Sequence, residues 1–232
     1  MPKHSKRYLA LAAKVDRTVR YPLSEAVTLA RETASAKFDE SLELSIKLNV
    51  NPSKGEENVR GTIVLPHGTG KTPRVAVFAE GDAAVAAREA GADRVGGEDL
   101  VEAIQQGWND FDVLVAQPQM MRIVGALGKM LGPRMPSKKA GNVLPDPSAA
   151  VQQLKAGRVE YRVDRGGVIH VPLGRLSFTE EQLMENLLAM LHAIVAARPA
   201  TVSGRYVLSV ALSTSMGPGI RVDLEDVRAK AA

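Results

Sequence analysis

The chain shows two kinds of hydrophobic pattern, one in its two outer segments and the other in its middle segment. Residues 41–49 and 159–164 alternate polar and apolar side chains, and this two-residue period predicts strands with one solvent-facing side. Between them, from Arg74 onward, short apolar runs alternate with helical patterns. That alternation predicts a parallel sheet covered by helices, in a segment distinct from the two ends of the chain.

The middle segment predicts strands at 75–79, 94–95 and 113–116, helices at 82–90, 98–107 and 119–131, a basic loop at 132–145 and a helix near 147–156. The outer segments predict a helix at 24–37 with Ser24 as N-cap, a strand at 61–66 antiparallel to 41–49, and a strand at 168–172. A long helix capped by Thr179 and Gln182 and a final strand at 205–212 complete the prediction.

The expected fold therefore combines α/β and α+β parts. We predict a discontinuous two-layer α+β domain, residues 1–66 and 159–232, which carries an inserted Rossmann-like three-layer α/β domain, residues 67–158. The chain has 232 residues, of which 45% are hydrophobic, and this is enough to build two cores.

Composition narrows the function classes. Cysteine is absent, which excludes disulfides, thiolate nucleophiles and sulfur-rich zinc sites. No long apolar run is present, so we expect a cytoplasmic protein without a membrane partner. The net charge is only +4, but six basic residues and one acid lie between Lys3 and Arg20, and five basic residues and no acid lie between Asp112 and Asp146. Either stretch could face polyphosphate or be a solvated surface.

Enzyme motifs fail when their spacing is checked. Residues 68–72, Gly-Thr-Gly-Lys-Thr, end like a phosphate-binding P-loop, but that motif needs glycine where Leu65 stands and a helix where residues 73–78 indicate a strand. The four histidines, at 4, 67, 170 and 192, form no metal-ligand motif, and no nucleophile or carboxylate constellation is visible. We expect no enzyme activity, no cofactor and no metal. The alternative is an α/β enzyme that uses a nucleotide at 68–72.

Two other segments suggest RNA. Residues 37–41 and 213–219 can end on the same side of one sheet, and Ser215, Met216 and Gly217 offer a hydroxyl, backbone donors and close backbone approach. Aromatic residues make up only 4% of the chain, which argues against a stacking platform and favours structured RNA as the target. Two alternatives stay open: Phe38 is a core-edge residue and 216–218 a plain turn, or RNA binds only to nonspecific basic surface.

A family resemblance runs along essentially the full chain. It rests on ordered motifs that include Met1-Pro2-Lys3-His4, Ala36-Lys37-Phe38-Asp39-Glu40, Leu65-Pro66-His67-Gly68, Leu131-Gly132-Pro133-Arg134 and Met216-Gly217-Pro218. With these motifs the chain resembles the bacterial ribosomal protein L-one family. The resemblance implies the same split α+β domain with a Rossmann-like insertion.

The resemblance also implies a function. It predicts a structural constituent of the large ribosomal subunit that binds structured ribosomal RNA, forms a mobile stalk near the tRNA exit site and assists release of deacylated tRNA. It further implies a translational repressor that binds its own mRNA leader. Other ribosomal components would be its remaining partners.

By the same resemblance, the RNA-binding residues form one set. They are Lys3, Lys6, Arg7, Lys37, Phe38, Glu40, Ser41, Asp164, Arg165, His170, Ser215, Met216 and Gly217, with a secondary contact by Arg134, Lys138 and Lys139. The chain departs from the family at three places. Ser215 stands where threonine is usual, Gly166 replaces a hydroxyl residue, and two residues are missing after Arg134, which leaves the secondary contact in doubt.

Overall fold

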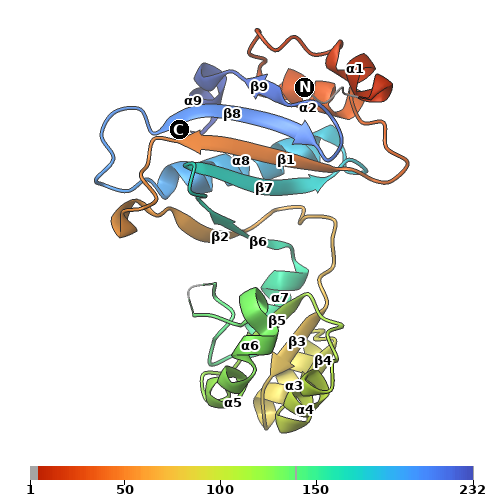
Figure 1. Cartoon of the computed structure of the whole chain (residues 1–232), viewed down its shortest axis with the longest axis vertical. Coiled ribbons are helices and arrows are strands. Elements are labelled where there is room, and N and C mark those ends of the chain that lie inside the picture. Colours follow the sequence, from red (N-terminus) through yellow and green to blue (C-terminus); the bar gives the residue numbers. More distant parts are fainter. Residues whose placement is uncertain (1–4, 139, 232) are drawn as a thin grey trace. The chain divides into compact units, whose positions relative to one another are not determined.

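The computed structural model describes residues 5–138 and 140–231 (Figure 1). The chain divides into two compact units: the first is formed by both ends of the chain, up to Gly70 and from Val159, and the second is Lys71–Arg158. Both units mix helices and sheets, which confirms the predicted fold class. Residues 67–70, which the sequence assigned to the insertion, lie in the first unit because buried Asn186 accepts from His67 N and donates to Gly68 O, both at 3.0 Å.

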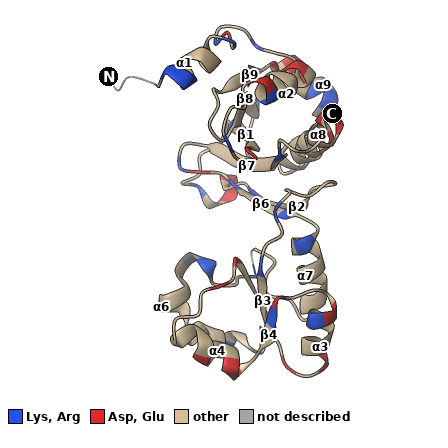
Figure 2. Cartoon of the chain, turned by 90° about the vertical axis from the view of Figure 1, so that its right-hand side faces the viewer, with Lys and Arg blue, Asp and Glu red and all other residues tan. Residues whose placement is uncertain are grey.

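The first unit is built on a four-stranded sheet in the order β7-β1-β8-β9. Its strands are β1 (Ser41–Leu48), β7 (Val168–Arg175), β8 (Val207–Thr214) and β9 (Ile220–Val222), and all neighbours are antiparallel. Alternate residues of β1, from Leu42 to Leu48, are buried in one core with side chains from three helices. These are α2 (Leu23–Glu32), α8 (Glu180–Ala196) and α9 (Leu224–Ala231). Figure 2 shows α2, α8 and α9 on one side of these strands.

Two strand predictions for this unit were wrong. β2 (Arg60–Val64) pairs with β6 (Arg158–Arg162) in a separate two-stranded sheet and not with β1. Both edges of β1 are already occupied by β7 and β8, so no edge is left for β2. The strand predicted to be the last is followed by β9 and α9, whose short patterns gave no clear signal.

The second unit has a three-stranded parallel sheet in the order β4-β3-β5. The strands are β3 (Val75–Phe78), β4 (Arg94–Gly96) and β5 (Val113–Ala116). Val75 and Val77 pack with α3 (Asp82–Glu89) and α7 (Pro147–Lys155), whereas Ala76 and Phe78 pack with α4 (Glu98–Gln105) and α5 (Met121–Ala126). Because successive residues of a strand point to opposite faces, the sheet is covered on both sides. The helix predicted at 119–131 is divided into α5 and α6 (Gly128–Leu131), and η2 (Gly132–Arg134) follows.

Helix starts show which local rules hold. Thr179 caps α8: its Oγ1 accepts from Gln182 N at 3.3 Å, and Gln182 Oε1 accepts from Thr179 N at 3.0 Å, so the predicted capping box is confirmed. The prediction for Ser24 was wrong. Helix α2 begins at Leu23, whose N–H donates to Asp226 Oδ2 at 2.7 Å, so its cap comes from α9.

No helix in the part of the chain that the structure describes is long and apolar enough to cross a membrane.

Candidate nucleic-acid interface

The four-stranded sheet has one face that helices leave open, and Figure 1 shows α8 behind the strands. On this face, called the open face below, β1 places Ser41, Glu43, Ser45 and Lys47, because its alternate residues are buried in the core. Neighbouring strands add further small or polar side chains, namely His170, Pro172, Ser209, Ala211, Ser213 and Arg221. The open face therefore offers hydroxyls, an imidazole and two cations without a bulky aromatic side chain.

At the Ser41 end of the open face, two loops are joined by a buried carboxylate. Glu40 is only 2% exposed. Its Oε1 accepts from Ser35 N at 3.0 Å and from Ala36 N at 2.8 Å, and its Oε2 accepts from Met216 N at 3.0 Å. Glu40 thus ties residues 33–40, called the Lys37 loop, to residues 215–219, called the Met216 loop.

The pKa of Glu40 reflects this clamp. Burial raises the pKa of the carboxyl, but the hydrogen bonds from Ala36 N–H, Met216 N–H and Ser35 N–H outweigh it, so the pKa lies below its ordinary value. The carboxylate is ionised at neutral pH and its acceptors are used within the protein. Glu40 therefore positions groups that face solvent, and its direct contact with RNA stays a prediction.

Further contacts hold the two loops in register. Ser41 N donates to Ser215 Oγ, and Ser215 N donates to Ser41 O, both at 3.1 Å. From α1 (Lys6–Ala12), Arg7 donates to Ser35 Oγ at 2.6 Å and to Met216 O at 3.3 Å. The N-terminal helix therefore bonds to the same loops, and the sequence had given no reason to pair Arg7 with Met216.

These loops present Lys37, Phe38 and Met216 to solvent, together with Ser35, Asp39 and Ser215. Phe38 is 56% exposed and Met216 is 48% exposed, and the Glu40 clamp holds their two loops together. Phe38 is therefore not a core-edge residue. An exposed ring and thioether beside a lysine can pack against ribose or bases while the ammonium neutralises a phosphate.

Asp164 and Arg165 lie at the other end of β1. They belong to the turn between β6 and β7, where Leu48 N donates to Gly167 O at 2.8 Å and Lys47 Nζ donates to Gly166 O. Six residues of extended strand separate Ser41 from Lys47, a distance of roughly 20 Å. Asp164 Oδ1 accepts from Val168 N at 2.8 Å, so its carboxylate shapes the turn, whereas Arg165 is exposed.

His170 connects the two ends. It lies opposite Ser45 in the β1–β7 register, and its Nδ1 is 3.0 Å from Ser45 Oγ. The predicted residues of the first unit are thus not one compact cluster but a band that runs along the open face from the Met216 loop, past His170, to Arg165. Glu43, Lys47 and Ser213 belong to this band and were missed, because only the sheet register shows which alternate residues share a face.

Gly217 has an internal reason to be glycine. A Cβ atom there would collide with Thr214 Oγ1 and lie 3.4 Å from Thr33 Oγ1. Thr214 and Thr33 are both buried. The sequence interpretation assigned this glycine to close approach of RNA, whereas the structure shows that the Met216 loop itself already needs the space.

The remaining predicted residues are Lys3, Lys6, Arg134, Lys138 and Lys139. Lys3 and Lys139 lie outside the described residues. Lys6 is exposed on α1, next to Arg7. Arg134 and Lys138 belong to the second unit, where the Arg134 guanidinium lies 5.8 Å from the centroid of the buried Phe111 ring. Arg134 and Lys138 thus belong to a different unit from the band.

The Gly-Thr-Gly-Lys-Thr segment is an extended connection. Gly68 and Gly70 have φ of 66° and 70°, and the segment leads into β3, with α3 starting only at Asp82. A P-loop places its lysine and threonine at a helix N-terminus, where backbone N–H groups cradle phosphate. Residues 68–72 do not have that geometry.

Comparison with known proteins identifies the family. The model of the ribosomal protein L1p/L10e family matches residues 30–218. The chain is 52% identical over 231 residues to "Large ribosomal subunit protein uL1" of Bordetella pertussis, covering 99% of this chain and 100% of the relative. The protein of the same name from Lactobacillus acidophilus is 53% identical over 225 residues, covering 96% and 98%. These matches confirm the resemblance and, since the family is one of ribosomal proteins, the prediction that the chain is not an enzyme. The chain belongs to the ribosomal protein L1p/L10e family.

Proposed function

We propose that this protein is a structural constituent of the large subunit of the cytoplasmic ribosome and binds structured ribosomal RNA through its first unit. The observation that carries the RNA-binding proposal is the band on the open face, with the clamped Lys37 and Met216 loops at one end and Arg165 at the other. The names of the full-length relatives support the assignment to the large subunit.

The chemistry of the band suits folded RNA. An RNA helix presents 2′-hydroxyls and phosphates on a wide, shallow groove, and proteins read it mainly by shape. The serines of the band can donate to and accept from 2′-hydroxyls, and Lys37, Lys47 and Arg165 can neutralise phosphates at separate points along about 20 Å. The buried Glu40 clamp fixes the loops beforehand, so binding does not have to order them.

The test is binding of the full chain to a large-subunit stalk RNA fragment and to a scrambled RNA of equal length, across a salt series. We expect a preference for the cognate fragment that survives rising salt, because shape recognition adds to phosphate neutralisation. Equal, steeply salt-sensitive binding to both RNAs would leave only nonspecific basic surface and would contradict the proposal.

Single variants test whether the band is the RNA-binding surface. Lys37→Ala and Arg165→Ala should each lower the magnitude of the salt slope by about one and weaken cognate binding. The control is Arg88→Ala, which removes an equal charge from an exposed site on α3 and should change neither quantity. If Arg88→Ala weakens cognate binding as much as Arg165→Ala, the band is not the interface.

We also propose the finer roles that family membership suggests: a mobile stalk near the tRNA exit site, help in releasing deacylated tRNA, and repression through the protein's own mRNA leader. The support for the last role is physical, because a surface that reads shape will bind any RNA that folds into that shape. A leader RNA should therefore compete with the ribosomal fragment, and Arg165→Ala should weaken both. A leader that binds without competing would refute a shared site.

A further inference from the structure

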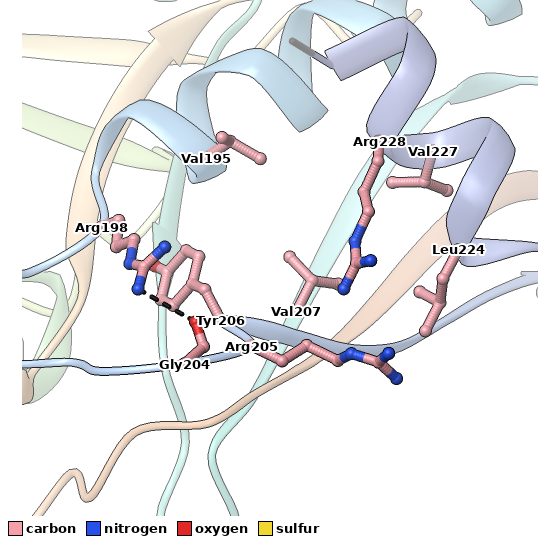
Figure 3. A pocket seen from close by; sticks show the side chains of 9 residues that line it. All are labelled: Val195, Arg198, Gly204, Arg205, Tyr206, Val207, Leu224, Val227 and Arg228. Atoms are coloured by element: carbon pink, nitrogen blue, oxygen red, sulfur yellow. Dashed lines mark hydrogen bonds between the residues drawn. The ribbon is translucent and has the colours of Figure 1, made fainter.

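A second binding feature lies in the first unit, at the opposite end of β8 from the Met216 loop. A pocket of about 370 Å³ opens between the end of α8, the start of β8 and α9 (Figure 3). Its lining residues are Val195, Arg198, Gly204, Arg205, Tyr206, Val207, Leu224, Val227 and Arg228. None of the residues in the proposed RNA-binding band lines it.

The inner wall of the pocket is apolar. Val195, Val207, Leu224 and Val227 present aliphatic groups, and Val195 is 36% exposed. The Tyr206 side chain completes the wall; it is 5% exposed, and burial raises the pKa of its hydroxyl to about 12. Tyr206 is therefore a neutral, fixed surface at any physiological pH.

The rim of the pocket is cationic. Arg198 is a structural residue, since its Nη2 donates to Val202 O at 2.8 Å and to Gly204 O at 3.0 Å. Arg205 and Arg228 are exposed and have no ion pair or hydrogen-bonded side-chain partner among the described residues. In Figure 3, Arg228 descends from α9 toward Val207, and Arg205 extends below Leu224. None of the described residues that line the pocket is acidic.

An aliphatic wall beside two uncompensated guanidinium groups selects the kind of partner. Nucleobases stack on aromatic rings or guanidinium planes, but the one aromatic ring of the wall, Tyr206, is only 5% exposed. The accessible wall is therefore mainly aliphatic, which gives little to a base and suits leucine-like side chains. Arginine and tyrosine around an apolar centre are also the residues enriched in protein interfaces. We propose that this pocket docks a protein segment that carries aliphatic side chains flanked by carboxylates.

The test uses the full chain and a fluorescein-labelled peptide in which two leucines are flanked by glutamates. Binding is measured by anisotropy and located by methyl NMR signals of Val195, Val207, Leu224 and Val227. We expect a dissociation constant of about 1 mM or lower and chemical-shift changes concentrated on these methyl groups. Binding to Arg228→Glu should be about tenfold weaker. The matched control, Arg88→Glu, makes the same charge change on α3 and should bind like the unchanged protein.

Three outcomes would overturn the proposal. A peptide with serines in place of the leucines that binds equally well would show attraction by charge alone. If Arg88→Glu lost as much peptide affinity as Arg228→Glu, the peptide would be attracted by the overall positive charge of the protein and not by this pocket. If Arg228→Glu weakened stalk RNA more than Arg88→Glu did, the pocket would belong to an RNA surface. The last measurement also separates this proposal from the RNA-binding function, on which it does not rest.

Discussion

Replacing Glu40 with glutamine should loosen the Met216 loop although it changes only one atom type. The carboxylate accepts three backbone N–H groups, two on Oε1 and that of Met216 on Oε2. Glutamine has one acceptor oxygen, and its NH₂ group can only donate. If the glutamine oxygen keeps the hydrogen bonds from Ser35 N–H and Ala36 N–H, the side-chain NH₂ group faces Met216 N–H. Two donors then face each other and cannot form a hydrogen bond. The Met216 hydrogen bond is then lost in a buried position.

The size of the effect follows from that one bond. A hydrogen bond to a charged group is worth about 1.5–3 kcal/mol. At about 2 kcal/mol, opening of the Met216 loop becomes about 30-fold more frequent, since about 1.4 kcal/mol is a factor of ten. RNA affinity should fall by up to a similar factor, because binding must then order a loop that was held in place.

Hydrogen–deuterium exchange of the Met216 amide measures the opening directly, and RNA affinity is measured on the same protein. The control is Glu25→Gln, which removes the same charge from an exposed site on α2 of the same unit and should change neither quantity. If Met216 in Glu40→Gln exchanged as slowly as in Glu25→Gln, the clamp argument would fail. This would hold even if RNA affinity dropped.

Three further predictions concern stability. Thr179→Ala should lower the free energy of unfolding of the first unit by about 1 kcal/mol in urea, while Ser24→Ala changes it by far less, because Thr179 caps a helix and Ser24 does not. Asn186→Ala should cost about 3 kcal/mol in the same assay by unpairing His67 N, the partly buried carbonyl of Gly68 and the buried carbonyl of Leu173. Because the folded pKa of Glu40 lies below its ordinary 4.5, its stabilisation is present above that value and lost as pH falls through the folded pKa. Met216 protection in the unchanged protein should therefore approach that of Glu40→Gln in this acidic window.

Local patterns predicted most of the elements, and tertiary contacts decided the rest. The period-two segments 41–49 and 159–164 became β1 and β6, and the βαβ alternation became the parallel sheet of the second unit. The start of α2 was missed because its cap, Asp226, lies about two hundred residues along the chain. The pairing of β2 was missed because sequence proximity favoured a hairpin with β1, whose two edges were already taken by strands from the C-terminal half.

The site was predicted as a set of residues but not as a geometry. Motif resemblance placed Lys37, Glu40 and Met216 in the interface, and the structure does bring their loops together. Motif resemblance could not show that Glu40 is buried beneath the loops. For a glutamate between a helix and a strand, no sequence pattern distinguishes a carboxylate that joins two loops from one that contacts RNA. Nor could it show that Arg165 lies a strand length away, since that depends on the register of β1 against β7.

Gly217 is the residue at which a packing role and an RNA-contact role can be separated. Gly217→Ala should weaken cognate RNA binding, because the new Cβ collides with Thr214 Oγ1 and displaces the Met216 loop. Thr214→Ala removes the colliding hydroxyl and leaves the strand position filled by a small residue. If packing is the reason for glycine, the double variant should regain most of the RNA affinity and the Met216 exchange protection that Gly217→Ala loses, with Thr214→Ala as the reference. If instead RNA needs the space at Gly217, protection will return in the double variant but affinity will not. The second outcome would place Gly217 in direct contact with RNA and contradict the packing argument.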